Sequence, residues 1–419
     1  MSPRTTLDGS PRQAVVDGFT HGGEGVARVQ GKAVFVPGAL PGEVVRLRVV
    51  DDRKRWARAE LLEVVAPSPD RVAPPCPYVP ECGGCDLQHA AVPAQRRLKT
   101  RVVIEQLQRL GGVADPPVEP CREVGPATGY RAQARLRADP DGHLGFHRAG
   151  STEVVPIDRC LILTDAAQGV RDTVGDTSGA AELAVRGIDP DGGAVATLRP
   201  GPGALQLPEG PFDLLLEQPG GELVPMRGDG HLDVEVAGLV FGVPADAFFQ
   251  PSHPAAEALV AAVREALGDV RGALVWDLYA GVGLLSLALA ADGAEVVAVE
   301  GNAAAAAAAT RNAARNELAL TVLTEPVDEV VAGGAGGDLP LEPPDLVVLD
   351  PPRTGAGPDI IADLAGASPA MVVYVACDVA ALARDTAALS AAGYRLTRAV
   401  PLDLFPMTHH VEVVASFVR

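Results

Sequence analysis

Helix-length and strand-length apolar segments alternate along the chain from Pro254 onward. Such alternation predicts an α/β fold with a doubly wound, largely parallel sheet and helices on both faces. Strands are expected at 274–278, 295–299, 320–323, 346–349 and 371–375, with closing strands near 395–400 and 411–418. Helices are expected at 255–267, 284–291, 303–318, 359–364 and 379–391. We therefore predict one sheet domain over residues 246–419.

The length and charge of the chain indicate more than one domain and an uneven electrostatic character. A chain of 419 residues with 47% hydrophobic content is long enough for two or three domains. Its formal net charge of −19 argues, by itself, against a nucleic-acid partner. Residues 1–150, however, carry a net charge of +4 and the remainder −23. The N-terminal third is therefore the part expected to contact phosphates.

Neither a leader sequence nor a membrane span is expected from the sequence. The first residues are polar, and no charge-free stretch of about 18 apolar residues occurs. We predict a cytoplasmic protein with no membrane partner.

The first 67 residues have the pattern of a small β-barrel. Short β-prone runs between residues 14 and 65 are separated by glycine-rich or Pro-Gly turns. Segments 22–28 and 31–43 strongly resemble the TRAM domain, an RNA-binding barrel of the oligonucleotide-binding type. The resemblance implies an RNA-binding barrel over residues 1–67.

Residues 68–245 combine a cysteine-rich loop, a basic helix and a region of alternating apolar and polar positions. The loop at 68–90 is rich in Pro, Cys and Gly, and residues 94–110 have helical spacing under a basic face. Frequent turns between residues 130 and 245 suggest a mainly antiparallel middle domain.

Three cysteines crowded into the loop indicate a metal site. Cys76, Cys82 and Cys85 supply three thiolates, and Cys121 or Cys160 is the candidate for the fourth. Four thiolates hold either structural zinc or a four-iron four-sulfur cluster, and the spacing alone does not choose between them.

A cofactor pocket is expected where the strands of the C-terminal domain end. The strand at 274–278 runs into a glycine-containing turn, and Glu300 follows the next strand. A nicotinamide-binding oxidoreductase is the alternative, but Ser286 occupies the position of the third glycine of that fingerprint. Together with Asp350, which is followed by two prolines, these parts resemble the S-adenosylmethionine-dependent methyltransferase fold.

Cys377 and Glu412 are candidates for covalent catalysis. Carbon 5 of uracil is too weak a nucleophile to attack a methyl sulfonium, but a thiolate added to carbon 6 activates it. The reaction then needs a base that removes the carbon 5 proton. Cys377 follows a predicted strand and precedes a helix whose N-terminus is expected to lower the pKa of the thiol.

The segments 374–385 and 403–412 together resemble the 5-methyluridine RNA methyltransferase family, and the likeness covers nearly the whole chain. The resemblance implies that Cys377 is the nucleophile, that Glu412 accepts the proton, and that structured ribosomal or transfer RNA is the substrate. It also implies S-adenosylmethionine contacts from four residues and Cys160 as the fourth thiolate of an iron–sulfur cluster, with zinc as the alternative. The four cofactor contacts are Gln250, Tyr279, Glu300 and Asp350.

Three departures from the family pattern accompany this resemblance. Ser252 and Leu284 each replace an Asn, and Asp378-Val379 replaces Asn-Pro after the nucleophile. Two other functions compete with uridine methylation. One is a non-catalytic RNA-binding protein, and the other is a methyltransferase acting on cytosine carbon 5 or on an exocyclic amine.

Overall fold

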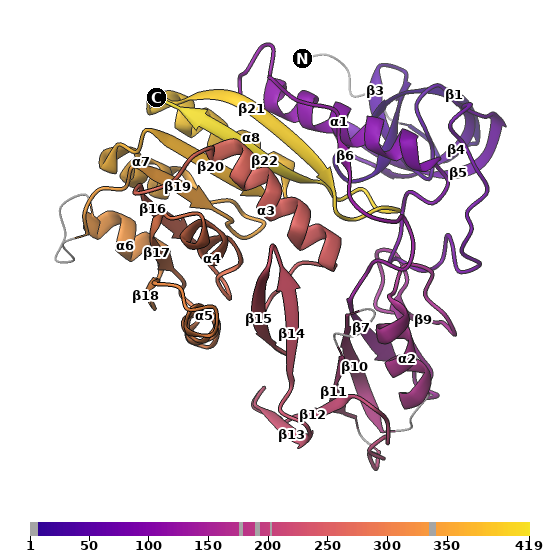
Figure 1. The fold of residues 1–419 in the computed structure, drawn as a ribbon. Helices are drawn as coiled ribbons and strands as arrows, with labels where there is room; N and C mark the ends of the chain where they lie inside the picture. The colour runs from indigo at the N-terminus through magenta and orange to yellow at the C-terminus, as the bar shows by residue number, and fades with distance from the viewer. Residues whose placement is uncertain (1–6, 176–178, 189–192, 202, 335–340) are drawn as a thin grey trace.

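The computed structural model describes residues 7–175, 179–188, 193–201, 203–334 and 341–419. A barrel, a middle sheet and a large α/β sheet are joined by the cysteine loop and a long helix (Figure 1). Among the helices of these ranges, none is both long and apolar enough to cross a membrane.

The N-terminal strands close into the predicted barrel. The strands are β1 (Arg12–Phe19), β2 (Glu24–Val29), β3 (Lys32–Pro37), β4 (Val44–Asp52) and β5 (Trp56–Ala66), in the order β1-β2-β3-β5-β4. Alternate residues point inward, so Val16, Val34 and Leu47 are fully buried. Gln30 and Gly31 both have positive φ, as the two-residue turn between β2 and β3 requires.

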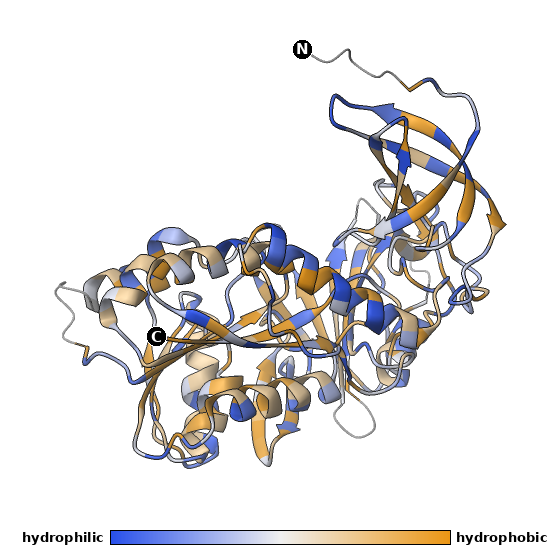
Figure 2. Cartoon of the chain, turned by 90° about the horizontal axis from the view of Figure 1, so that it is seen from above, coloured by the Kyte–Doolittle hydropathy of each residue, from blue (hydrophilic) through white to orange (hydrophobic). Residues whose placement is uncertain are grey.

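The long helix α1 (Val92–Arg109) belongs to the large sheet rather than to the middle one. It begins with Pro93 in its first turn, where a missing N–H is tolerated. Its residues Val103 and Leu107 are buried against Leu382 and Ala383 of α8 (Val379–Ala391). Hydrophilic residues recur along its outer side (Figure 2). After α1 the short strand β6 (Arg122–Glu123) joins the edge of the large sheet.

The middle domain is a seven-stranded sheet with the order β13-β12-β11-β10-β7-β8-β9. The bounds are β7 (Gln133–Ala138), β8 (Leu144–His147), β9 (Val154–Pro156), β10 (Ala180–Gly187), β11 (Ala194–Pro200), β12 (Asp213–Glu217) and β13 (Leu223–Arg227). The strand pairs of this sheet are antiparallel, except for β11–β12, which is parallel. This pattern agrees with the mainly antiparallel sheet that the sequence predicts. Helix α2 (Asp165–Val174), capped by Thr164, covers one face.

The hairpin of β14 (His231–Val236) and β15 (Leu239–Pro244) packs against the large domain. Its residues Val234, Val236 and Phe241 share a core with Leu259 of α3 (His253–Leu267) and Leu287 of α4 (Leu284–Ala291). Although its residues were expected within the middle sheet, the hairpin forms a separate two-stranded sheet.

The large sheet has eight strands in the order β18-β17-β16-β19-β20-β22-β21-β6. The strands are β16 (Leu274–Leu278), β17 (Glu295–Val299), β18 (Thr321–Leu323), β19 (Leu346–Leu349), β20 (Met371–Ala376), β21 (Arg395–Asp403) and β22 (Glu412–Val418). Strands β16, β17, β18, β19 and β20 are all parallel to one another, whereas β22 is antiparallel to β20 and to β21. The predicted doubly wound sheet is confirmed.

Consecutive side chains of a strand point to opposite faces of the large sheet, so they pack in two different hydrophobic cores. Val275 packs with α3, α4 and α5 (Ala303–Arg315), whereas Trp276 packs with α6 (Val327–Gly334), α7 (Pro358–Ala367), α8 and α1. The sequence prediction missed α6 and extended α5 to residue 318. Helix α5 ends earlier because Asn316 caps it and Glu317 turns to a φ of 55°.

Candidate active site

Four predicted site residues follow four neighbouring parallel strands at one edge of the sheet. Tyr279 follows β16, Glu300 follows β17, Asp350 follows β19 and Cys377 follows β20. The strand ends are in register, because Leu278 pairs with both Val299 and Leu349. The carboxyl edge of a doubly wound sheet is where ligands bind.

Glu412 reaches the same edge because its strand runs in the opposite direction. It is the first residue of β22, and Ala376 pairs with Val413. Cys377 and Glu412 therefore lie at the adjoining ends of neighbouring strands. The structure brings the expected nucleophile and the expected base together.

A cavity of about 50 Å³ lies between the ends of β16 and β19. Here the strand order reverses, which is the usual crevice for a nucleotide-like ligand. Gly283 has a φ of 89°, and a Cβ there would lie 2.7 Å from Leu287 Cδ1. The lining residues are Phe248, Phe249, Gln250, Leu259, Asp277, Tyr279, Ala280, Gly281, Val282, Leu284, Leu285 and Asp350.

Glu300 holds the glycine turn rather than capping the next helix. Its carboxylate accepts hydrogen bonds from Gly281 N at 2.8 Å and from Asn302 N at 2.7 Å. The cap of α5 is Asn302, whose Oδ1 accepts from Ala305 N. Glu300 thus fixes the backbone that lines the cavity.

Gln250 lies on a loop anchored to the middle sheet and is 8% exposed. Phe249 O accepts from Gln133 Nε2 at 3.0 Å, and Pro251 O accepts from Ala132 N at 2.7 Å. Beside it, Phe248 is 70% exposed at the cavity. The middle domain therefore helps to place the loop that forms one wall of this cavity.

Two of the three departures from the family pattern act as helix caps. Ser252 Oγ accepts from Ala255 N at 3.1 Å at the start of α3. Asp378 Oδ1 accepts from Ala381 N at 2.7 Å at the start of α8. Both residue types are favoured at such positions. The third departure, Leu284, is buried in the cavity wall.

The expectation of a lowered thiol pKa at Cys377 is wrong. Burial, followed by the charges of Glu412 and Asp350, raises the pKa of Cys377 to about 12, and Arg353 opposes this shift. The α8 terminus also carries its own anion, because Asp378 caps it. The thiol is therefore protonated at neutral pH.

Carboxyl groups crowd this edge of the sheet. Burial, and then the charge of Asp350, raises the pKa of Glu412 well above its usual value, while Arg353 opposes the shift. Burial, and then Asp277, raises the pKa of Asp350 to about 7. Asp277 is buried and accepts a hydrogen bond from Ser286 Oγ. A low-charge site of this kind is suited to proton transfer near neutral pH.

Two residues near Cys377 and Glu412 were absent from the predicted site. Arg353 is the cation that faces Cys377 and Glu412, and its position directly after Asp350-Pro351-Pro352 was the available signal. His410 lies two residues before Glu412, and burial lowers its pKa to about 4, followed by the effect of His409. It is therefore neutral at physiological pH.

The four cysteines Cys76, Cys82, Cys85 and Cys160 line one cavity of about 200 Å³. The cavity lies between the cysteine loop and the middle domain, to which Phe146 of β8 and Ile157 belong. Cys121 is buried elsewhere, in the core beneath α1 and near Asp403. Of the two candidates for the fourth thiol, Cys160 is the one beside the other three.

Known proteins resemble this chain over almost its whole length. Residues 6–62 match the TRAM domain. An uncharacterized RNA methyltransferase of Streptomyces avermitilis is 35% identical over 97% of this chain and 98% of its own. The 23S rRNA (uracil(1939)-C(5))-methyltransferase RlmD of Shewanella sp. strain ANA-3 is 33% identical over 99% of this chain and 97% of its own.

A solved structure shares the fold. The Pyrococcus abyssi tRNA (uracil-54, C5)-methyltransferase, crystallised with S-adenosyl-L-homocysteine, superposes with a TM-score of 0.76 at 24% identity. The match covers 97% of this chain and 99% of that one. The barrel, the middle sheet and the large sheet are therefore arranged as in an existing fold.

The protonated state of Cys377 predicts an unusual pH dependence of its alkylation. Because its pKa is about 12, the thiolate fraction should still rise tenfold per pH unit between pH 8 and pH 10. A small thiol with a pKa of about 8.5 levels off in that range. Alkylation rates measured by peptide mass spectrometry test this expectation, and a plateau at Cys377 below pH 9 would contradict it.

Proposed function

Since this chain belongs to the RNA uracil-C5 methyltransferase family, we propose that it methylates a uridine of ribosomal or transfer RNA through a covalent adduct with Cys377. The observation that carries the proposal is the meeting of Cys377 and Glu412 at the sheet edge that also forms the cofactor cavity. A thiol and a carboxyl group in that place match what carbon 5 methylation requires. Methylation of an exocyclic amine requires no thiol.

The proposed reaction has three steps. Cys377 Sγ, as the thiolate, adds to carbon 6 of the uracil and turns carbon 5 into an enolate carbon. S-adenosylmethionine supplies the methyl group, which carbon 5 attacks, and S-adenosylhomocysteine is released. Glu412 then removes the proton from carbon 5, the double bond between carbons 5 and 6 forms again, and the bond between carbon 6 and sulfur breaks.

Thiolate formation is the step that the surroundings of Cys377 oppose. Burial and two carboxyl groups favour the neutral thiol, whereas the charge of Arg353 and a backbone hydrogen bond favour the thiolate. We propose that Arg353 assists the attack, and that Glu412, once ionised, is a strong base because its pKa is raised. Target uridines in a folded RNA would need to be flipped out of their stack to reach this edge.

We propose that Gln250, Tyr279, Glu300 and Asp350 bind S-adenosylmethionine. All four lie at or beside the crevice between β16 and β19. Glu300 already accepts two backbone hydrogen bonds, but an ionised carboxylate has further lone pairs for ribose hydroxyls.

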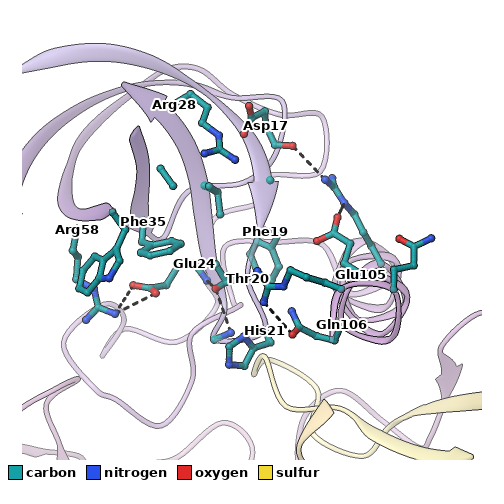
Figure 3. A pocket seen from close by; sticks show the side chains of 18 residues that line it. Asp17, Phe19, Thr20, His21, Glu24, Arg28, Phe35, Arg58, Glu105 and Gln106 are labelled. Atoms are coloured by element: carbon teal, nitrogen blue, oxygen red, sulfur yellow. Dashed lines mark hydrogen bonds and ion pairs between the residues drawn. The ribbon is translucent and has the colours of Figure 1, made fainter. Parts of the chain in front are cut away.

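A large groove between the barrel and α1 is the proposed path of the RNA (Figure 3). It has a volume of about 1030 Å³ and is formed by the end of β1 and the turn after it, by β2, β3 and β5, and by the C-terminal half of α1. Phe35 and Trp56 lie with ring centroids 5.8 Å apart on its wall. Exposed aromatic rings of this kind stack on the bases of single-stranded nucleic acid.

Among the described residues that line the groove, two arginines, Arg28 and Arg109, have no carboxylate partner, and Arg109 donates to Gln106 Oε1. Arg58 pairs with Glu24, as the dashed lines of Figure 3 show. Arg101 pairs with Glu105. Arg28 is exposed, and within the described residues it has no carboxylate partner. The barrel therefore offers RNA an aromatic pair and an available guanidinium, despite the acidic character of the whole chain.

We propose that Cys76, Cys82, Cys85 and Cys160 hold a four-iron four-sulfur cluster that fastens the cysteine loop to the middle domain. A tetrahedral zinc ion, at about 2.3 Å from each sulfur, keeps four sulfurs about 3.8 Å apart. Among the described residues, only Asp139, Asp141 and His143 place three ligand atoms within 4.8 Å of one another. The thiol sulfurs are thus more widely spaced, which favours a cluster over zinc.

A cytoplasmic location is part of this proposal. The RNA substrates lie there, and the reducing environment keeps the cysteine thiols available as ligands.

The covalent mechanism predicts opposite effects for two substitutions. Cys377→Ala should abolish methyl transfer and the protein–RNA adduct. Glu412→Gln should still transfer one methyl group but retain the RNA, because the carbon 5 proton is not removed. Denaturing gels of mixtures with radiolabelled S-adenosylmethionine measure both results, with Cys121→Ala as the control. Full methyl transfer by Cys377→Ala would disprove the adduct.

The groove predicts two losses of RNA affinity. Trp56→Ala should weaken RNA binding by about 1–3 kcal/mol, which is the free energy that stacking of one base on an aromatic ring usually contributes. Arg28→Ala should reduce the slope of the logarithm of affinity against that of salt concentration by about one. Fluorescence anisotropy with substrate RNA measures both. Arg48→Ala, an exposed arginine paired with Glu60 outside the groove, is the matched control. Equal RNA affinities of the unmodified protein and the three variants would exclude the groove as the path of the RNA.

The cluster predicts a difference between two cysteine variants. Anaerobically purified Cys160→Ser should lose bound iron and sulfide, whereas Cys121→Ser should keep both. Elemental analysis together with visible absorption measures the difference. Zinc without iron in the unmodified protein would contradict the cluster, and full iron content in Cys160→Ser would exclude that residue as a ligand.

A further inference from the structure

The segment 404–411 joins β21 to β22 and leads directly into Glu412. Its residue Met407 has a φ of 67°, which is uncommon for a residue with a side chain. A backbone in this conformation persists only where its surroundings hold it. The contacts of Met407 are therefore informative about how the segment is fixed.

Both backbone polar groups of Met407 are bound by parts of the chain far away in sequence. Its N–H donates to Gln95 Oε1 of α1 at 2.8 Å. Its carbonyl accepts from Leu87 N at 2.9 Å and from Asp86 N at 3.2 Å, in the cysteine loop. Gln95 is fully buried, and its Nε2 donates to Leu87 O at 3.1 Å and to Ala90 O at 2.9 Å. One glutamine thus joins the loop, the helix and the segment.

Further bonds hold the residues on either side of Met407. His409 N donates to Asp86 Oδ1 at 2.8 Å. Tyr130 Oη donates to Pro406 O at 3.0 Å, and Lys99 Nζ donates to Phe405 O at 3.0 Å. The segment is therefore anchored outside its own sheet at three consecutive positions, 405 to 407, and then at His409.

The barrel also touches this segment. Gly23, in the turn between β1 and β2, has a φ of 80°, and a Cβ there would lie 2.9 Å from His409 Cβ. The same Cβ would lie 3.1 Å from Asp86 Oδ2. The turn therefore fits against the segment only with glycine at this position.

We propose that Gln95 and Asp86, with the barrel turn at Gly23, are positioning residues that hold segment 404–411 so that Glu412 can remove the carbon 5 proton. The inference rests on the base role proposed for Glu412. None of the residues 404–411 lines the cofactor cavity. Loosening the segment should therefore slow proton removal and leave cofactor binding and methyl transfer intact.

The test is a single-turnover experiment with saturating RNA and radiolabelled S-adenosylmethionine. Gln95→Met keeps the side-chain volume and removes its hydrogen bonds. It should transfer the methyl group at the normal rate but release the methylated RNA on the order of ten to a hundred times more slowly, because small misplacements of a catalytic group have effects of that size. Thr100→Val, which removes a hydrogen bond to Cys121 from the same helix, should release RNA normally.

A second pair of variants tests the proposal independently, so that it can be judged even where Gln95→Met does not fold. Gly23→Ala adds a methyl group against His409, whereas Gly31→Ala introduces the same backbone strain at a φ of 82° where nothing lies within 4 Å. The methylated covalent complex should accumulate in Gly23→Ala and not in Gly31→Ala. Equal release rates for this pair, together with normal release by Gln95→Met, would overturn the proposal.

Glu412→Gln serves as the reference that separates this inference from the proposed function. Accumulation of the methylated complex in Glu412→Gln, without accumulation in Gln95→Met or Gly23→Ala, would overturn the positioning role alone. Rapid release by Glu412→Gln would instead overturn the base role itself. Loss of methyl transfer in Gln95→Met, with normal cofactor affinity and no complex, would also contradict the proposal, because it would place the defect before proton removal.

Discussion

The antiparallel pairing of β22 with β20 is the constraint on which the site depends. Strands β16 to β20 all end at one edge, so a residue that follows any of them reaches the cofactor crevice. A further parallel strand would bring its first residue to the opposite edge. Because β22 runs the other way, its first residue, Glu412, meets Cys377 at the end of β20. Two chemically different groups thus come together from backbone pairing alone.

Much of the large domain could be predicted from the sequence, because its periodicity is strong. The expected strands at 274–278, 295–299 and 346–349 agree with β16, β17 and β19. Helix α6 was missed because it is short and ends in glycine residues. The hairpin of β14 and β15 alternates like any half-buried strand pair, and alternation does not reveal which core it will join.

The electrostatics of the site could not be predicted in this way. A cysteine before a helix suggests a lowered pKa, yet the pKa of Cys377 is raised because the fold buries it beside Glu412 and Asp350. Gln95 was equally hidden, since a glutamine in a basic helix resembles a solvated residue. Only the fold shows that it is fully buried and bonded to a segment more than 300 residues away in sequence. Periodicity along the sequence does not show which residues that are far apart in the chain lie close together in the fold.

The most direct test of the account is nucleoside mass spectrometry after reaction in vitro. The purified protein would be incubated with S-adenosylmethionine carrying a deuterated methyl group and with unmodified ribosomal and transfer RNA in separate reactions. The account predicts labelled 5-methyluridine from one of the two RNAs and no other labelled nucleoside. Label in 5-methylcytidine or in an N-methylated base, or no label in either RNA, would contradict it.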